Sequence, residues 1–273
     1  ELALMMGSEK PVSTEAVEIQ GTPYTKEVYA DKNLYFNANG QLAVIEVTKP
    51  VYADALEKAI AAYQKAYDLD ASHAKSKDIA AAFDLIGQKY NTEAYNKYTL
   101  GDLASASKYF EKAAEVEALA PLSKIDTTSI YNAGFTAWAT KDMSKAKELF
   151  EKCYNLGYYY EGGEVFAKLA DVDTLNTKKY LEEGFEKFPQ SQSILIGLIN
   201  YYLKSNESTD RLFELLDKAK ANEPNNASLF YVEGNIRSQL GDTENAVKAY
   251  RKCAEINPEY EYGFIGEGTM YYN

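Results

Sequence analysis

The residues that could support catalysis are few and poorly grouped. The only histidine, His73, lies beside Ser72 and Lys75, just after a predicted helix, and it reads as a solvated turn residue. Metal binding or general-base catalysis needs further ligands or bases at fixed spacing. Gly162 and Gly163 form an isolated pair without the pattern of a phosphate-binding loop. We therefore predict no enzymatic activity, no catalytic residues, no metal site and no cofactor.

Aromatic side chains dominate the remaining chemistry. The chain of 273 residues contains 24 Tyr, 11 Phe and one Trp. Rings with a polar edge suit surfaces that are apolar and still wet, such as protein interfaces, and also the seams between packed helices. The rings therefore indicate binding or packing rather than catalysis.

The charge excludes one class of partner. Lys and Arg number 29 against 41 Asp and Glu, so the net charge is −12. Such a chain repels phosphate backbones, and we predict no nucleic-acid partner. No apolar run approaches the ~18 to 20 residues of a membrane helix, so no membrane-spanning segment is expected. The first residues lack an initiator Met and a basic region, which suggests a processed or truncated amino terminus.

A repeat of about 34 residues organises the second half of the chain. Pro224 and Pro258 are 34 residues apart, and Pro189 precedes Pro224 by 35. Upstream of these prolines and elsewhere, a small, an aromatic and a small residue recur at i, i+4 and i+7, which places them on one helix face. The clearest sets are Ala106, Phe110 and Ala113; Ala146, Phe150 and Cys153; and Ala246, Tyr250 and Cys253.

These features resemble the tetratricopeptide repeat (TPR) family, whose unit is a helix–turn–helix of ~34 residues. Residues 227–260 match best, through Phe230, Gly234, Gly241, Ala246, Tyr250, Cys253 and Pro258. Arg237 departs from the pattern because it stands where the family has a tyrosine on its first helix. The resemblance implies an all-α fold, a right-handed superhelix (α-solenoid) of antiparallel helix pairs.

The predicted solenoid covers residues 55–273. Its units are 87–120, 127–157, 158–191, 193–226 and 227–260, with a half unit at 261–273 whose open face suggests a truncated chain or a covering partner. Residues 1–54 fit no unit and are assigned to an irregular or diverged N-terminal cap. Within them, Val44–Val47 could be a short strand, but a diverged helix is at least as compatible with the pattern.

The two cysteines occupy equivalent positions three repeats apart. Helices packed ~8 to 10 Å apart would separate Cys153 and Cys253 by tens of ångströms. A disulfide tolerates Cα atoms only ~4.4 to 6.8 Å apart, so we expect two buried, unpaired thiols.

The resemblance also implies a binding surface, because first helices line the concave groove in this family. Counting along each first helix leaves a free face rich in rings and amides: Asn91, Tyr95, Tyr98, Tyr131, Asn132, Phe135, Trp138, Phe166, Tyr201, Tyr231 and Asn235. Members that clamp the carboxylate of chaperone tails use Lys and Arg at these positions, and this chain lacks that basic set.

The leading interpretation is a non-catalytic scaffold or adaptor whose aromatic groove binds a protein or peptide partner. An alternative is a carbohydrate or small-ligand site on the same rings and amides, and a third is self-assembly through the two irregular ends. Several rings could equally fill helix seams. The composition favours a bacterial protein outside the cytoplasm, with a cytoplasmic location as the alternative.

Overall fold

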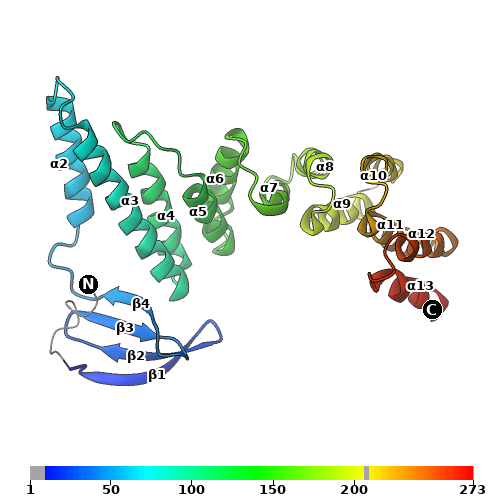
Figure 1. Ribbon diagram of the computed structural model, residues 1–273, viewed down its shortest axis with the longest axis horizontal. Helices are drawn as coiled ribbons and strands as arrows, with labels where there is room; N and C mark the ends of the chain where they lie inside the picture. Colours follow the sequence, from blue (N-terminus) through cyan, green and yellow to red (C-terminus); the bar gives the residue numbers. More distant parts are fainter. Residues whose placement is uncertain (1–9, 206–208, 273) are drawn as a thin grey trace. The chain divides into compact units, whose positions relative to one another are not determined.

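The computed structural model describes residues 10–205 and 209–272, and it divides into two compact units between Leu149 and Phe150. The first unit contains a small sheet and the first helices, and the second contains the remaining helices (Figure 1). Each unit is treated by itself. Within the described ranges, no helix is both long and apolar enough to span a bilayer.

An antiparallel sheet begins the described chain. Its strands lie in sequence order, β1 (Ser13–Ile19), β2 (Thr22–Val28), β3 (Lys32–Phe36) and β4 (Leu42–Val47). Gln20 and Gly21, both with positive φ, form the two-residue turn between β1 and β2. Leu34, Tyr35 and Val44 are its buried hydrophobic side chains. The helical alternative for Val44–Val47 is therefore wrong, and the sheet is the exception to the expected all-α chain.

Hydrogen bonds from two side chains join this sheet to the helices of the first unit. The Gln20 Nε2 donates to the carbonyl of Tyr98 at 2.8 Å, and the Asn96 Nδ2 donates to the carbonyl of Ile45 at 3.1 Å. Both connect the sheet to α3 (Ser76–Thr99). The sheet therefore lies against the C-terminal half of that helix.

The rest of the chain consists of helix–turn–helix pairs, which confirms the helical repeat class. After α2 (Ala55–Leu69), the pairs are α3 with α4 (Leu103–Glu117), α5 (Thr127–Ala139) with α6 (Met143–Asn155), α7 (Glu164–Val172) with α8 (Thr177–Lys187), α9 (Gln192–Lys204) with α10 (Asp210–Asn222), and α11 (Ala227–Gln239) with α12 (Thr243–Ile256). A short 3₁₀ turn, Glu161–Gly163, precedes α7, and α13 (Tyr262–Tyr272) follows α12.

The predicted small–aromatic–small stripe forms the core of the pairs. All nine of its residues in α4, α6 and α12 are at most 3% exposed. Gly234 shows why the first helix needs a small residue: a Cβ there would lie 2.4 Å from the Tyr250 ring. Cys153 and Cys253 are buried and unpaired, as expected.

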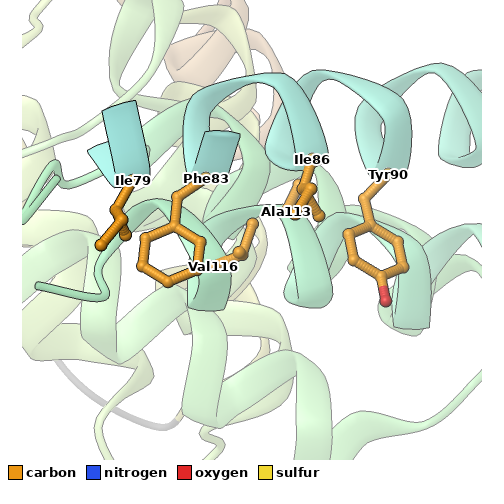
Figure 2. Close-up of a cluster of buried hydrophobic side chains, with 6 residues drawn as sticks. All are labelled: Ile79, Phe83, Ile86, Tyr90, Ala113 and Val116. Carbon is orange, nitrogen blue, oxygen red and sulfur yellow. The ribbon is translucent and has the colours of Figure 1, made fainter. Parts of the chain in front are cut away.

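The longest helix, α3, carries the core of the first unit. Figure 2 shows its buried face, where Ile79, Phe83, Ile86 and Tyr90 lie one turn apart and face Ala113 and Val116 of α4. Leu56, Ile60 and Tyr67 of α2 pack against the same cluster. The first turns of α3, before the predicted start of a unit at residue 87, are therefore held by α2.

In three of the pairs, a turn of the same type joins the first helix to the second. Gly101 and Gly241 adopt positive φ, and the aspartate that follows each of them caps the next helix. Asp102 accepts from the Ser105 amide at 3.2 Å, and Asp242 accepts from the Asn245 amide at 3.4 Å. Lys141, which replaces glycine in the third turn, also has a positive φ of 67°.

Candidate binding surfaces

The first candidate surface lies on α3 and α5 of the first unit. Tyr95 and Tyr98 are 52% and 39% exposed on α3, and the Asn132 Nδ2 of α5 donates to the Tyr95 hydroxyl at 3.1 Å. Phe135 and Trp138 follow on α5, with ring centroids 5.9 Å apart. We call these five residues the α3–α5 aromatic surface.

A lysine completes that surface. The Lys141 ammonium lies 5.5 Å from the centre of the Trp138 ring, within the range of a cation–π contact. The left-handed backbone at Lys141 therefore belongs to the turn that brings this cation over Trp138. Rings, an amide and a cation side by side suit the backbone and side chains of an extended peptide.

Two of the predicted contact residues are core residues, which corrects the sequence prediction. Tyr131 is 5% exposed and stacks on Phe135, and Phe166 is fully buried between the rings of Tyr159 and Phe188. The physical reason is that a first helix packs against its own partner and against the neighbouring pair. The face left for a ligand is therefore narrower than counting along one helix predicts.

Two predicted amides have packing partners. The Asn91 Oδ1 accepts from the Ser129 hydroxyl at 2.8 Å, and the Asn91 Nδ2 lies 3.4 Å from Asp126, which caps α5. The Asn235 Oδ1 accepts from the Tyr250 hydroxyl at 2.8 Å. These contacts give Asn91 and Asn235 a structural role in joining helices.

The second candidate surface is a cavity of about 520 Å³ in the second unit. It opens between α7, α8 and α9, and the predicted residue Tyr201 lines it. Asp171, Asn200 and Lys204 also line it and are not among the residues predicted from the sequence. The spacing of Asn200, Tyr201 and Lys204 within one turn of α9 was the available signal. We call this space the α7–α9 cavity.

Tyr231, the last predicted residue, belongs to a cluster of tyrosines at the end of the chain. Its ring lies 6.0 Å from Tyr250, 6.1 Å from Tyr260 and 5.5 Å from Tyr262, measured between centroids. Tyr231 is half-buried and Tyr262 is 45% exposed. The cluster therefore fills the seam between α11, α12 and α13 and leaves one ring at the surface.

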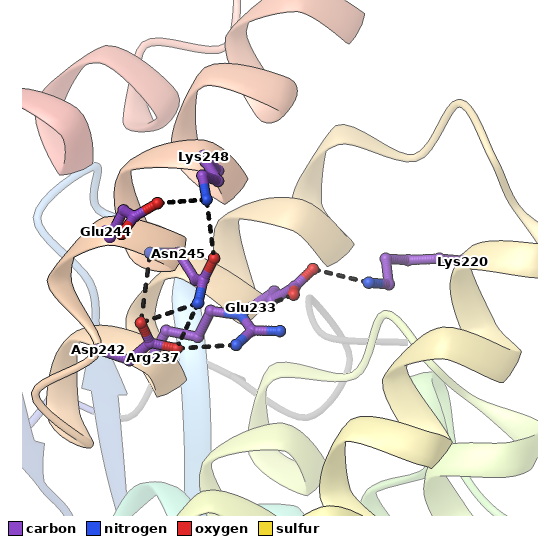
Figure 3. Close-up of polar contacts among 7 residues, drawn as sticks. All are labelled: Lys220, Glu233, Arg237, Asp242, Glu244, Asn245 and Lys248. Carbon is purple, nitrogen blue, oxygen red and sulfur yellow. Dashed lines mark hydrogen bonds and ion pairs between the residues drawn. The ribbon is translucent and has the colours of Figure 1, made fainter.

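Arg237 stands where the repeat pattern has a tyrosine, and its guanidinium group makes the packing and polar contacts at this position. Its guanidinium lies 4.5 Å from the centre of the Phe213 ring and donates to Glu233 at 2.8 Å and to Asp242 at 2.9 Å. Glu233 also accepts from Lys220 of α10 at 2.7 Å (Figure 3). We call Lys220, Glu233, Arg237 and Asp242 the α10–α12 ion network.

Burial keeps two titratable groups of the core in their neutral forms. Burial raises the pKa of the Cys153 thiol to about 12 and that of the Tyr250 hydroxyl to about 12, so both stay neutral near pH 7. In the part of the chain that the structure describes, no three His, Cys, Asp or Glu side chains are grouped to hold a metal ion.

Comparison with known proteins identifies the repeats. The tetratricopeptide repeat family model matches residues 127–156 and 227–260. A TPR repeat-containing protein of Methanocaldococcus jannaschii is 23% identical over 193 residues, which cover 63% of this chain and 34% of that protein. The chain thus spans about a third of the length of this curated relative.

Two solved structures of other proteins align with this chain at low identity. The TPR protein YrrB, described as having an unusual peptide-binding site, is 20% identical and aligns over 77% of this chain and all of its own, with a TM-score of 0.39. Yeast Tom70 is 16% identical, covers 80% of this chain and 44% of its own, and gives a TM-score of 0.43. The chain therefore contains tetratricopeptide repeats at residues 127–156 and 227–260, within a series of consecutive helix pairs.

Proposed function

We propose that this protein is a non-catalytic scaffold that binds a segment of a partner protein on its first-helix faces. The observation that carries the proposal is the α7–α9 cavity, because it opens between first helices of two successive pairs. Its lining joins one ring, one amide and one charge of each sign in Tyr201, Asn200, Lys204 and Asp171. Such a mixture suits a peptide, whose backbone needs amide partners and whose side chains need apolar contact.

The distribution of rings favours a peptide over a sugar as the occupant. A sugar site needs several rings and amides that converge on one cavity, whereas only Tyr201 supplies a ring to this one. The α3–α5 aromatic surface lies on other first helices and offers separate contacts. Within the first unit, rings spread over two first helices fit an extended segment better than a compact ligand.

A displayed library of random 15-residue peptides, panned against the immobilised full chain, tests the proposal. Affinities of the selected peptides, measured by fluorescence anisotropy, should fall about tenfold or more with Tyr201→Ala, as expected for an anchor residue. Tyr272→Ala is the matched control, because Tyr272 is 91% exposed and lies outside the cavity.

Two results would contradict the proposal. One is the absence of any peptide enriched over panning on bare support. The other is enriched peptides that bind equally well to both variants. A glycan array provides the second arm, since a tightly bound sugar that requires Tyr201 would favour the carbohydrate reading.

A further inference from the structure

A second cavity, of about 300 Å³, lies in the first unit where the sheet meets the helices. Strand β4, the segment before α2, the first turn of α2, one face of α3 and Tyr109 of α4 line it. No residue of the α3–α5 aromatic surface lines it. We propose that this cavity binds an alkylammonium group, the charged end of a small amine or of a lysine side chain.

The charge of the cavity favours a cation. Three carboxylates line it, from Glu46, Glu57 and Glu93, against the single ammonium of Lys97. Burial opposes the ionisation of Glu46, but hydrogen bonds from Asn33 at 2.9 Å and Tyr35 at 3.0 Å outweigh it and lower its pKa. Glu46 is therefore held in its charged form, and an anion would meet a surplus of negative charge.

The pKa of Glu93 indicates that Lys97 does not fully compensate the carboxylate charge in the cavity. Burial raises the pKa of Glu93, and the attraction of Lys97, a hydrogen bond from Asn96 and the attraction of Lys89 together offset only part of that rise. Lys97 also acts on Glu46, together with Lys26, so the one ammonium that lines the cavity is shared between two carboxylates. A second cation in the cavity would compensate the buried charge on Glu93.

Tyr90 supplies an independent sign of a missing partner. Its side chain is 1% exposed and lines the cavity, and its hydroxyl has no partner at hydrogen-bond geometry, although the Glu57 carboxylate lies near enough to act on it. Burial raises the pKa of this hydroxyl, and the Glu57 carboxylate raises it further. Buried polar groups nearly always have a partner, and the Tyr90 oxygen is able to accept a hydrogen bond from an ammonium N–H.

The remaining lining fits a short alkyl chain. Ile45, Val47, Leu56 and Leu100 provide apolar walls beside the carboxylates. A volume of about 300 Å³ is at the lower end for ligand cavities, so the occupant is small. Apolar side chains and carboxylates in one cavity match a chain of methylenes that ends in an ammonium group.

Isothermal titration calorimetry on the full chain with cadaverine tests the proposal. Pentan-1-ol, which has the same chain without the charge, should bind at least tenfold more weakly. Glu93→Gln and Tyr90→Phe should each weaken cadaverine binding about tenfold. Glu18→Gln is the matched control, because Glu18 is exposed on β1 and does not line the cavity.

Tyr90→Phe also separates binding from folding. A structural hydroxyl would lower the melting temperature when removed, whereas an unpaired one should leave it unchanged or raised. Should that variant unfold, Glu57→Gln at an exposed position provides the second test, with the same expected loss of cadaverine affinity.

Lysine methylamide and its Nζ-acetylated form distinguish the source of the ammonium group. Binding of the charged form alone, without cadaverine binding, would assign the cavity to a lysine of a polypeptide. The proposal is overturned if neither amine binds more tightly than pentan-1-ol, or if Glu93→Gln and Tyr90→Phe leave the affinity unchanged. Because Tyr201 is not part of this cavity, the outcome is independent of peptide binding at the α7–α9 cavity.

Discussion

The pairs α3–α4 and α11–α12 have the same type of turn between their helices. The side chains that pack between the two helices differ in kind from one pair to the other. In α3–α4 the seam is apolar, with Phe83 fully buried and Tyr90 nearly so. In α11–α12 the Tyr250 ring reaches Gly234, and beside it the α10–α12 ion network holds the pair to its neighbour. The repeat thus requires a capped turn and a well-filled seam, and it tolerates either rings or ion pairs as the filling.

The largest effect is expected where the seam is apolar. Phe83→Ala should destabilise the first unit by about 3–5 kcal/mol, because it removes a fully buried ring from the cluster on α2, α3 and α4. Urea denaturation with hydrogen exchange of α3 and α4 peptides measures the loss. Leu85→Ala, at a 58% exposed position of the same helix, should change stability by less than about 0.5 kcal/mol. Equal losses for both variants would deny that the cluster holds this unit.

A smaller effect is expected in the ion network. Arg237→Met keeps an apolar stem against Phe213 but leaves Glu233 with Lys220 alone, so a loss of about 1–3 kcal/mol is expected. Hydrogen exchange of α11 and α12 peptides localises it. Arg251→Met is the control, because its pair with Glu267 is on the surface and such pairs contribute only about 0–1 kcal/mol. A loss for Arg251→Met as large as that for Arg237→Met would remove the distinction between the two pairs.

The smallest expected effect is on the stability of the fold at acidic pH. Hydrogen bonding from Asn245, supported by Arg237, lowers the pKa of Asp242 below its ordinary value. Because the folded value is the lower one, the charged aspartate stabilises the fold above about pH 4, and that contribution is lost as the pH falls through the folded pKa. Melting curves of the full chain and of Asp242→Asn should therefore differ at pH 6 and converge near pH 2.5. A gap that stays constant over this range would show that the charge of Asp242 is not involved.

The sequence predicts the helical pairs well because their signal is local and repeated. The stripe at Ala246, Tyr250 and Cys253 and the turn at Gly241 and Asp242 depend on neighbours within one unit. Such patterns translate directly into one buried helix face.

The parts that depend on distant contacts were not predictable in this way. Most side chains of β1 are exposed, so the strand lacks a buried alternate face to mark it, and its register depends on β2. The start of α3 depends on α2, and the burial of Tyr131 and Phe166 depends on rings from other segments. The cavity lined by Tyr90 and Glu93 joins a strand to helices, which no single repeat pattern contains.

The α10–α12 ion network has a consequence for how this sequence can change. Glu233 serves both Lys220 and Arg237, and Arg237 also holds Asp242. Replacing one of these four residues removes one partner from a partly buried charge and changes the balance of the remaining pairs, so the effects of substitutions here are not additive. A return to the tyrosine of the common repeat pattern at Arg237 would therefore be accepted most easily together with a neutral residue at Glu233. These positions are expected to vary together, while the exposed pairs elsewhere on the helices change one at a time.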